Sequence, residues 1–347
     1  MNRRAFVAGV LSAPFVFSTR AFAQTAPVFI GDMHTHSFFG ESKYHFRPLA
    51  KAMASGNASL IAWSLVGDLL WFDVKTYKEK SAPAPGETFG WFQRELGRIK
   101  GHIAEQGLSM VRTSKDVDLA LQGKPHVLLS VEGANFIEND AGRVKIAFDA
   151  GIRQLQLVHY TSNSLGDIQT LQGRHNGLSD VGKRTIAECN RLGMLVDLAH
   201  CSDATTQSAL ALSRAPVVWS HGSVTKVQST ATEGPVWRRR QLPLELAKEI
   251  ASKGGVVGLW ALAPDVGKTV ESYADRMLEL AEWLGEDHVA FGTDINGLGL
   301  YATMKEFGEY KTIIEHWRRK RVPDARITKL AIGNYARVLK AAMNARA

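Results

Sequence analysis

Short apolar runs alternate with segments of helical periodicity along most of this 347-residue sequence. Eight of the runs are largely apolar at consecutive positions and too short for long helices, which is typical of strands buried on both faces of a sheet. They lie at residues 28–36, 60–66, 127–131, 154–158, 194–199, 216–220, 255–260 and 289–293. The pattern therefore predicts eight buried β-strands.

Amphipathic helices separate the predicted strands. Apolar positions three and four apart, as at Phe92, Leu96 and Ile99, indicate a helix with one buried face. We expect helices at residues 48–55, 88–106, 117–121, 143–149, 179–191, 204–212, 243–253, 270–284 and 326–342. Strands that alternate with helices predict a parallel sheet. Eight such units over roughly 300 residues favour a single-domain α/β protein with a closed (β/α)8 TIM barrel. No glycine-rich dinucleotide motif follows the first run, which argues against a Rossmann fold.

The first 23 residues have a different pattern. Arg3 and Arg4 precede an apolar run at residues 5–17, and residues 21–23 fit the small-x-small pattern of a cleavage site. The paired arginines favour a twin-arginine-type signal, and the run is too short to span a bilayer. We expect a signal peptide at residues 1–23 and the barrel domain at residues 24–347. The mature protein is then periplasmic or secreted, without stable membrane insertion.

Composition narrows the class of protein further. Hydrophobic residues make up 45% of the chain and charged residues 22%, as in ordinary globular proteins. The net charge of +8 is modest for this length, and the basic cluster at residues 237–240 is short. We therefore expect no nucleic-acid partner. The two cysteines, Cys189 and Cys201, do not form a disulfide framework, and we interpret both as structural.

Polar side chains that can bind metal stand at the ends of the predicted strands. The carboxyl ends of barrel strands meet at one mouth, where active sites of such barrels lie. His34 and His36 are two positions apart, so on a strand they project to the same side. The residues at or just past the strand ends are His34, His36, Glu132, His159, His200, His221 and Asp294. Together they form a nitrogen and oxygen donor set that suits zinc and related divalent ions.

This donor set exceeds the needs of one tetrahedral zinc. Four histidines (His34, His36, His200 and His221) with Glu132 as a bridging carboxylate fit two divalent ions, most simply two Zn²⁺. A water between two such ions becomes a hydroxide nucleophile near neutral pH. Asp294 is then placed to move the proton to a leaving amine, and His159 to stabilise the oxyanion. The predicted chemistry is hydrolysis of a small amide or ester.

Several segments resemble the membrane (renal) dipeptidases of the metal-dependent amidohydrolase superfamily. The resemblance extends over nearly the whole mature chain in order, and its most specific part is residues 177–200. The other similar segments are residues 131–133, 151–155 with His159, 216–221, 292–294 and 334–339. It implies a (β/α)8 barrel, a binuclear zinc centre and cleavage of dipeptides with a free carboxyl terminus.

By position, the resemblance also implies roles for individual residues. Glu132 is similar to the bridging carboxylate, and His200 and His221 to ligands of the second metal. His159 is similar to the histidine that polarises the substrate, and Asp294 to the aspartate that shuttles the proton. Arg240, with Arg239 close behind it, is the best match to the arginine that binds the substrate carboxylate. A solvated basic loop is the alternative interpretation of these arginines.

One departure from the family pattern leaves alternatives open. The family's first strand usually ends in His-x-Asp, whereas here it ends in His34-Thr35-His36. A neutral imidazole in place of a carboxylate makes the metal pair more positive, which bears on metal preference and substrate. We therefore also consider hydrolysis of N-acyl amino acids, lactones or other small amides and esters, and a non-catalytic metal- or ligand-binding barrel. Substrate side chains and oligomeric state stay open, a homodimer included.

Overall fold

Eight parallel strands form a closed barrel in the structure, a computed structural model that describes residues 27–36, 48–227 and 235–345. Each barrel strand pairs with the barrel strand before and after it, and the last pairs with the first, with Asp32 opposite Phe291. The barrel strands are β1 (Ile30–His36), β2 (Ala58–Val66), β6 (His126–Glu132), β7 (Ile152–Gln156), β8 (Leu195–Asp197), β9 (Val218–Trp219), β12 (Val256–Leu259) and β13 (Val289–Phe291). Each overlaps one predicted run, and the predicted single-domain (β/α)8 barrel is confirmed.

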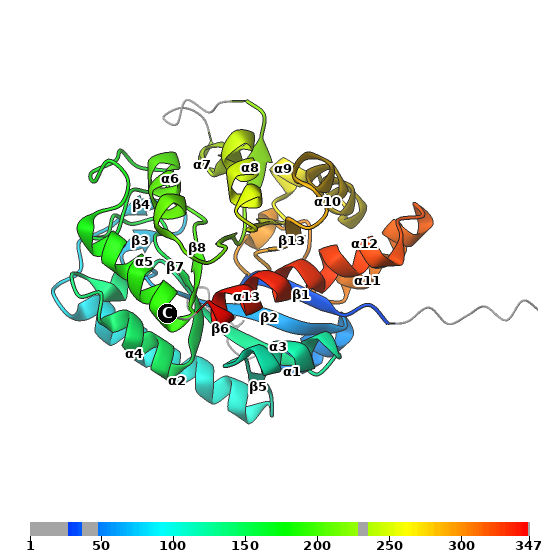
Figure 1. The fold of residues 1–347 in the computed structure, drawn as a ribbon, viewed down its shortest axis with the longest axis horizontal. Coiled ribbons are helices and arrows are strands. Elements are labelled where there is room, and N and C mark those ends of the chain that lie inside the picture. Colours follow the sequence, from blue (N-terminus) through cyan, green and yellow to red (C-terminus); the bar gives the residue numbers. More distant parts are fainter. Residues whose placement is uncertain (1–26, 37–47, 228–234, 346–347) are drawn as a thin grey trace, which may run out of the picture.

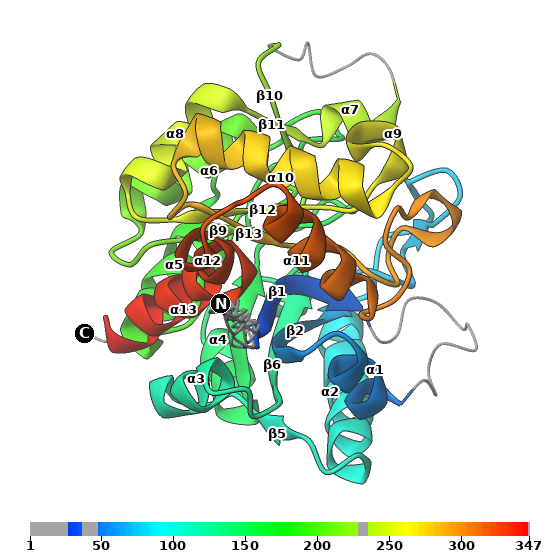
Figure 2. The ribbon, with the colours of Figure 1, turned by 90° about the vertical axis from the view of Figure 1, so that its right-hand side faces the viewer.

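Helices surround the barrel on its outer side (Figures 1 and 2). Those that overlap predicted helices are α1 (Leu49–Ser55), α2 (Glu87–Glu105), α3 (Ser114–Leu121), α4 (Arg143–Ala150), α5 (Asp180–Leu192), α6 (Asp203–Leu212), α8 (Leu244–Ser252) and α10 (Val270–Leu284). The helix α11 (Glu309–Arg319) was not predicted, although its buried residues Tyr310, Ile313 and Trp317 have helical spacing. Charged residues between these positions obscure that pattern.

The single helix predicted at residues 326–342 is wrong in detail. The structure has α12 (Asp324–Thr328), a π-helical turn η4 (Lys329–Gly333) and α13 (Asn334–Asn344). The widened turn brings Ile332 against Gly31, where an added Cβ atom would lie 3.0 Å from the Ile332 side chain. The Asn334 amide donates to the carbonyl oxygens of Glu286 and Val289 at 2.7 and 2.8 Å. These tertiary contacts anchor the turn, and local periodicity does not encode them.

The C-terminal helix α13 closes the amino end of the barrel. Its residues join a buried cluster with interior positions of the strands: Met33, Leu60, Leu128, Leu195, Val218, Val256, Ala290, Tyr335 and Leu339. The Tyr335 hydroxyl donates to the Gln154 side chain at 2.9 Å inside the barrel. Because side chains fill this end, only the carboxyl ends of the strands are left for a site.

Shorter elements decorate the barrel. The hairpin β3 (Phe72–Asp73) and β4 (Lys78–Glu79) follows β2, and the parallel pair β10 (Ser223–Thr225) and β11 (Gln241–Pro243) follows β9. The remaining elements are β5 (Ser109–Met110), η2 (Asn135–Ile137), α7 (Val236–Arg239), α9 (Ala263–Val266) and η3 (Gly299–Tyr301). The predicted signal peptide lies outside the described residues. Within them, every helix is too short or too polar to cross a bilayer.

The interior packing of the barrel can be tested at a glycine. An added Cβ atom at Gly292 would lie 1.7 Å from the carbonyl oxygen of Ser220. We expect Gly292→Ala to lower the free energy of unfolding by about 3 kcal/mol or more, because the backbone oxygen cannot move aside. As a control, Gly101→Ala on the exposed side of α2 meets no atom within 4 Å. It should raise stability by about 0.5–1 kcal/mol. Urea unfolding followed by tryptophan fluorescence measures both, and a fully stable Gly292→Ala protein would contradict the packing described.

Candidate metal centre

All seven side chains predicted from the strand ends lie together at the mouth of the barrel, and all are buried. His36 is the last residue of β1 and His34 lies two positions before it. Glu132 is the last residue of β6. The others follow the ends of their strands: His159 after β7, His200 after β8, His221 after β9 and Asp294 after β13. The parallel barrel therefore brings together residues that are up to 260 positions apart in the sequence.

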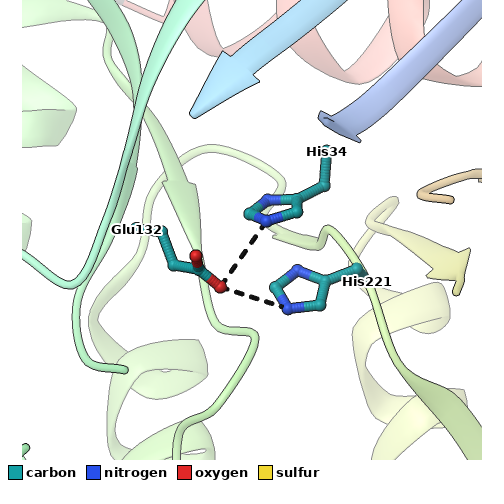
Figure 3. A group of neighbouring side chains, drawn as sticks. All are labelled: His34, Glu132 and His221. Carbon is teal, nitrogen blue, oxygen red and sulfur yellow. Dashed lines mark ion pairs between the residues drawn. The ribbon is translucent and has the colours of Figure 1, made fainter. Parts of the chain in front are cut away.

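Glu132 lies at the centre of this cluster. Its Oε1 atom is 3.5 Å from Nε2 of His34 and 3.4 Å from Nε2 of His221, and both rings point toward it (Figure 3). The same oxygen lies 3.2 Å from Nε2 of His200. The other oxygen, Oε2, is 3.4 Å from Nε2 of His36. One carboxylate thus faces the Nε2 atoms of all four histidines predicted as metal ligands, with its two oxygens directed to different rings.

The four histidines form two pairs around Glu132. The Nε2 atoms of His34 and His36 are 3.1 Å apart, and those of His200 and His221 are 3.0 Å apart. Burial is the main cause that lowers the pKa of His34, His200 and His221 well below the usual value, so these rings are neutral. Neutral imidazoles with converging lone pairs, next to a buried carboxylate, are the donor set that divalent metals such as zinc prefer.

Asp294 lies beside the first pair. Its Oδ1 atom is 3.1 Å from Nε2 of His36 and 3.9 Å from Nε2 of His34. Burial alone would lower the pKa of His36, but the hydrogen bond to Asp294 and the charge of Glu132 outweigh it and raise the pKa. The backbone is left-handed at Asp294 (φ 57°) and also at His200 (φ 70°). Such conformations are rare for residues other than glycine and cluster at functional sites.

Asp68 belongs to the site and was missed from the sequence. It is fully buried in the loop after β2, and its Oδ1 accepts a hydrogen bond from Nδ1 of His159 at 2.6 Å. Its Oδ2 accepts from the backbone amides of Tyr160 and Thr161 and from the Thr161 hydroxyl at 3.1, 2.8 and 3.0 Å. Its position was the signal that could have identified it, because Asp68 lies two residues after the end of β2, and the other loop residues of the site follow their strands at similar spacing.

The hydrogen bond to Asp68 favours the protonated form of His159. Burial would lower the pKa of His159, but the Asp68 charge outweighs it and the pKa is raised. Burial would likewise raise the pKa of Asp68, and the His159 charge and hydrogen bond lower it. Nε2 of His159 faces the cluster, 3.3 Å from Oε1 of Glu132. This ring therefore presents an N–H donor to the mouth.

Arg239 and Arg240, the two candidates for the carboxylate-binding arginine, have different surroundings in the structure. Arg240 is buried, with Nη2 3.4 Å from Nε2 of His221 and Nε donating to the Gln169 side chain at 3.2 Å. Arg239 instead donates to the backbone oxygen of Thr170 at 2.9 Å. Within the described ranges no carboxylate forms a salt bridge with Arg240, so its buried charge is available to an anion at the mouth.

The residues present fit two divalent ions. Glu132 Oε2 is buried and accepts no hydrogen bond from the part of the chain that is described. Two sets of three residues each bring their donor atoms within 4.8 Å of one another, namely His34 with His36 and Asp294, and Glu132 with His159 and His200. A third set joins His34, Glu132 and His221. Because a buried carboxylate without a donor is costly, a cation between these groups would satisfy it.

The barrel with this cluster at its carboxyl end is an amidohydrolase-like fold. The sequence profile of the membrane dipeptidase family, peptidase family M19, matches residues 93–347, well over half of the chain. The chain belongs to this family, and the resemblance noted from its motifs is confirmed.

Curated relatives agree with this assignment. The dipeptidase verJ of Clonostachys rogersoniana is 31% identical over 238 residues, which are 67% of this chain and 59% of that protein. The dipeptidase tcpJ of Claviceps purpurea is 28% identical over 225 residues, 63% of this chain and 51% of that protein. The chain therefore spans between half and three fifths of the length of these relatives.

Solved structures share the fold at low sequence identity. An amidohydrolase from Pseudomonas aeruginosa is 20% identical with a TM-score of 0.73, covering 91% of this chain and 97% of that one. A metallopeptidase from Rhodobacter sphaeroides, solved with a phosphinate mimic of the dipeptide L-Ala-D-Ala, is 19% identical with a TM-score of 0.72. That similarity covers 91% of this chain and 99% of the other. These likenesses show the barrel architecture.

Zinc binding tests the central position of Glu132. Zinc should raise the melting temperature of the metal-free protein, because it binds only the folded state. In Glu132→Gln we expect zinc affinity to fall by about 100-fold or more, since the one anion that faces all four rings is lost. His126→Gln is the control, because His126 is buried at the opposite end of the same strand. Equal zinc affinity in the wild type and Glu132→Gln would exclude the cluster as the metal centre.

Proposed function

We propose that this protein is a metal-dependent dipeptidase that hydrolyses the amide bond of small dipeptides. The observation that carries the proposal is the arrangement of two histidine pairs around Glu132, with the buried guanidinium of Arg240 beside them. Membership of the membrane dipeptidase family supports it. The bound dipeptide mimic of the R. sphaeroides metallopeptidase supports a dipeptide-sized substrate for the same fold.

The metal centre would be held by His34, His36, Glu132, His200 and His221. Two divalent ions, which we propose to be zinc, would act as Lewis acids on the scissile carbonyl and would make the proton of the attacking water easier to remove. Glu132 would join the two halves of the centre, because it faces both His36 and His200. His36, in place of the family's usual carboxylate, gives the first half one negative charge less.

The remaining groups bind the substrate and move its protons. Arg240 pairs with the free carboxylate of the dipeptide, and a guanidinium suits this contact because it can donate two parallel hydrogen bonds. His159, held by Asp68, donates from Nε2 to the carbonyl oxygen as negative charge develops on it. Asp294, at the other side of the cluster, takes the proton of the attacking water and gives it to the leaving amine.

Two further proposals extend this function. Hydrolysis of N-acyl amino acids, lactones or other small amides and esters is the alternative reaction, since the same centre activates any of these carbonyls. The signal-like residues 1–23 support export to the periplasm or beyond, which fractionation of cells that express the full chain would test.

A substrate panel distinguishes the two reactions. The purified protein is assayed with zinc on L,L-dipeptides, L,D-dipeptides, N-acetyl amino acids and simple lactones. We expect dipeptides with a free carboxylate to be hydrolysed, with about two zinc ions bound per chain. Hydrolysis of N-acyl compounds or lactones alone would replace the dipeptidase proposal. Absence of all turnover in the zinc-loaded protein would favour a binding function.

Substitution of Arg240 tests the carboxylate contact. For a free dipeptide we expect kcat/KM to fall by about 100-fold in Arg240→Met, because a charge-assisted pair is lost. For the same dipeptide as its carboxyl amide we expect little change. Arg239→Met is the matched control and should behave as the wild type with both substrates, since its guanidinium contacts Thr170 instead. An equal loss for both substrates in Arg240→Met would contradict the proposed contact.

A further inference from the structure

Tyr160 lies among the groups that we propose to contact the substrate. Its ring centre is 4.5 Å from that of His159 and 4.9 Å from that of His200. The guanidinium carbon of Arg240 lies 5.9 Å from the centre of the same tyrosine ring. A dipeptide with its scissile carbonyl beside His159 and its carboxylate on Arg240 would therefore lie along Tyr160.

Tyr77 continues this aromatic surface outward. Its ring centre is 5.0 Å from that of Tyr160, within the usual range of aromatic pairs. Tyr160 is 9% exposed and Tyr77 is 38% exposed, so the two rings lead from the metal cluster toward solvent. The pKa of Tyr77 is raised, first by burial and then by the charge of Asp294, whereas the charge of Arg240 lowers it. Because charges act strongly only over short distances, Tyr77 lies on the side of its hairpin that faces the mouth.

The turn between β3 and β4 holds Tyr77 in a defined position. The backbone amide of Tyr77 donates to the carbonyl oxygen of Asp73 at 2.7 Å. The Asp73 side chain accepts from the backbone amides of Lys75 and Thr76 at 2.7 and 3.1 Å. The backbone of Tyr77 is left-handed, with φ at 56°. Such a conformation is rare for a bulky residue, and residues that adopt it cluster at functional sites.

Both strands of the β3–β4 hairpin are attached to the loop after β7, which carries His159 and Tyr160. Phe72 in β3 is buried, with its ring centre 5.5 Å from that of Tyr160 and 5.2 Å from that of His159. In β4 the Glu79 carboxylate accepts a hydrogen bond from the backbone amide of Ser162. The two tyrosine rings are therefore held in place without a ligand, which lowers the entropy lost when one binds.

Exposed apolar side chains gather on the same side of the barrel. In the described ranges nine large apolar side chains are exposed, and six of them lie in the segments that follow β2, β9 and β13. These six are Leu70, Val74, Tyr77, Val227, Leu300 and Tyr301. The carboxyl end of the barrel is thus more apolar than the outer helix faces, as is common for surfaces that bind apolar ligands.

We propose that Tyr77 and Tyr160 bind a large apolar side chain, so that the preferred substrates are dipeptides whose carboxyl-terminal residue is aromatic or a large aliphatic one. The inference rests on the proposed dipeptidase function, because it names the substrates of the same site. Arg240 determines which residue is selected. The carboxylate and the side chain of the carboxyl-terminal residue leave the same carbon atom, so a carboxylate paired with Arg240 places that side chain beside Tyr160.

The first test measures dipeptide binding to the metal-free protein by titration calorimetry, so it does not depend on turnover. We expect L-Ala-L-Phe to bind about 10-fold or more tightly than L-Ala-L-Ala, because the larger side chain leaves water. In Tyr77→Ala this ratio should fall by about 5-fold, since one aromatic contact is lost. Tyr77→Phe keeps the ring and should retain the ratio. Equal affinity of the wild type for both dipeptides, or an unchanged ratio in Tyr77→Ala, would overturn the proposal.

Two controls make this ratio specific. Leu212→Ala shortens another exposed apolar side chain, at the end of α6 and close to the amino end of β9, and should leave the ratio as in the wild type. The second control is L-Ala-L-Glu, because the hairpin also carries Lys75, Lys78 and Lys80. Tighter binding of L-Ala-L-Glu than of L-Ala-L-Phe would show that these lysines select the side chain, and would contradict the proposal.

The second test compares kcat/KM for the same dipeptides in the zinc-loaded proteins, and it separates this inference from the proposed function. If the wild type hydrolyses L-Ala-L-Ala and L-Ala-L-Phe equally well and binds them equally, the dipeptidase function stands and the inference fails. If neither dipeptide is hydrolysed, the proposed function fails, and the binding ratio still decides the role of Tyr77. If the metal-free protein binds neither dipeptide, the ratio of kcat/KM decides instead. Absence of both binding and turnover would overturn both proposals.

Discussion

The structure depends on one electrostatic constraint, the burial of the Glu132 carboxylate among imidazole rings at the barrel mouth. A carboxylate removed from water is strongly destabilising unless charge or hydrogen bonds compensate it. Here burial raises the pKa of Glu132, and the charges of His159 and His36 act against that shift. Four other strands end in histidine side chains that face this one group. A bound cation would remove the remaining imbalance, so the fold and the metal centre are best understood as one unit.

The polar groups around the centre differ in how firmly they are held. Asp68 accepts four hydrogen bonds and immobilises His159, whereas the ring of His34 has a hydrogen bond with the neutral hydroxyl of Ser64. Arg240 is buried and donates to Gln169, so its guanidinium is oriented without any bound ligand. The groups that we propose to act on the substrate are therefore prepositioned by other side chains of the protein. This arrangement lowers the entropy lost on binding.

The barrel could be predicted from the sequence because its strands are buried on both faces and so appear as continuous apolar runs. That His34, Glu132 and Asp294 lie together could also be predicted, since a parallel barrel brings the carboxyl ends of its strands to one mouth. Asp68 was missed, because a lone aspartate after an apolar run has no partner within reach along the chain. Its partner His159 lies 91 residues away, and only the fold brings the two together. The π-helical turn was missed for the same reason, as its anchors lie on Gly31 and Glu286.

Closure of the barrel by β13 against β1 has a consequence for synthesis of the protein. During translation β1 emerges early, but one of its edges is unpaired until β13 has left the ribosome about 250 residues later. His34 and His36 lie on β1 and Asp294 follows β13, so their contacts also form only after β13 has been made. The nascent chain therefore carries an unpaired strand edge while the roughly 250 residues between β1 and β13 are made.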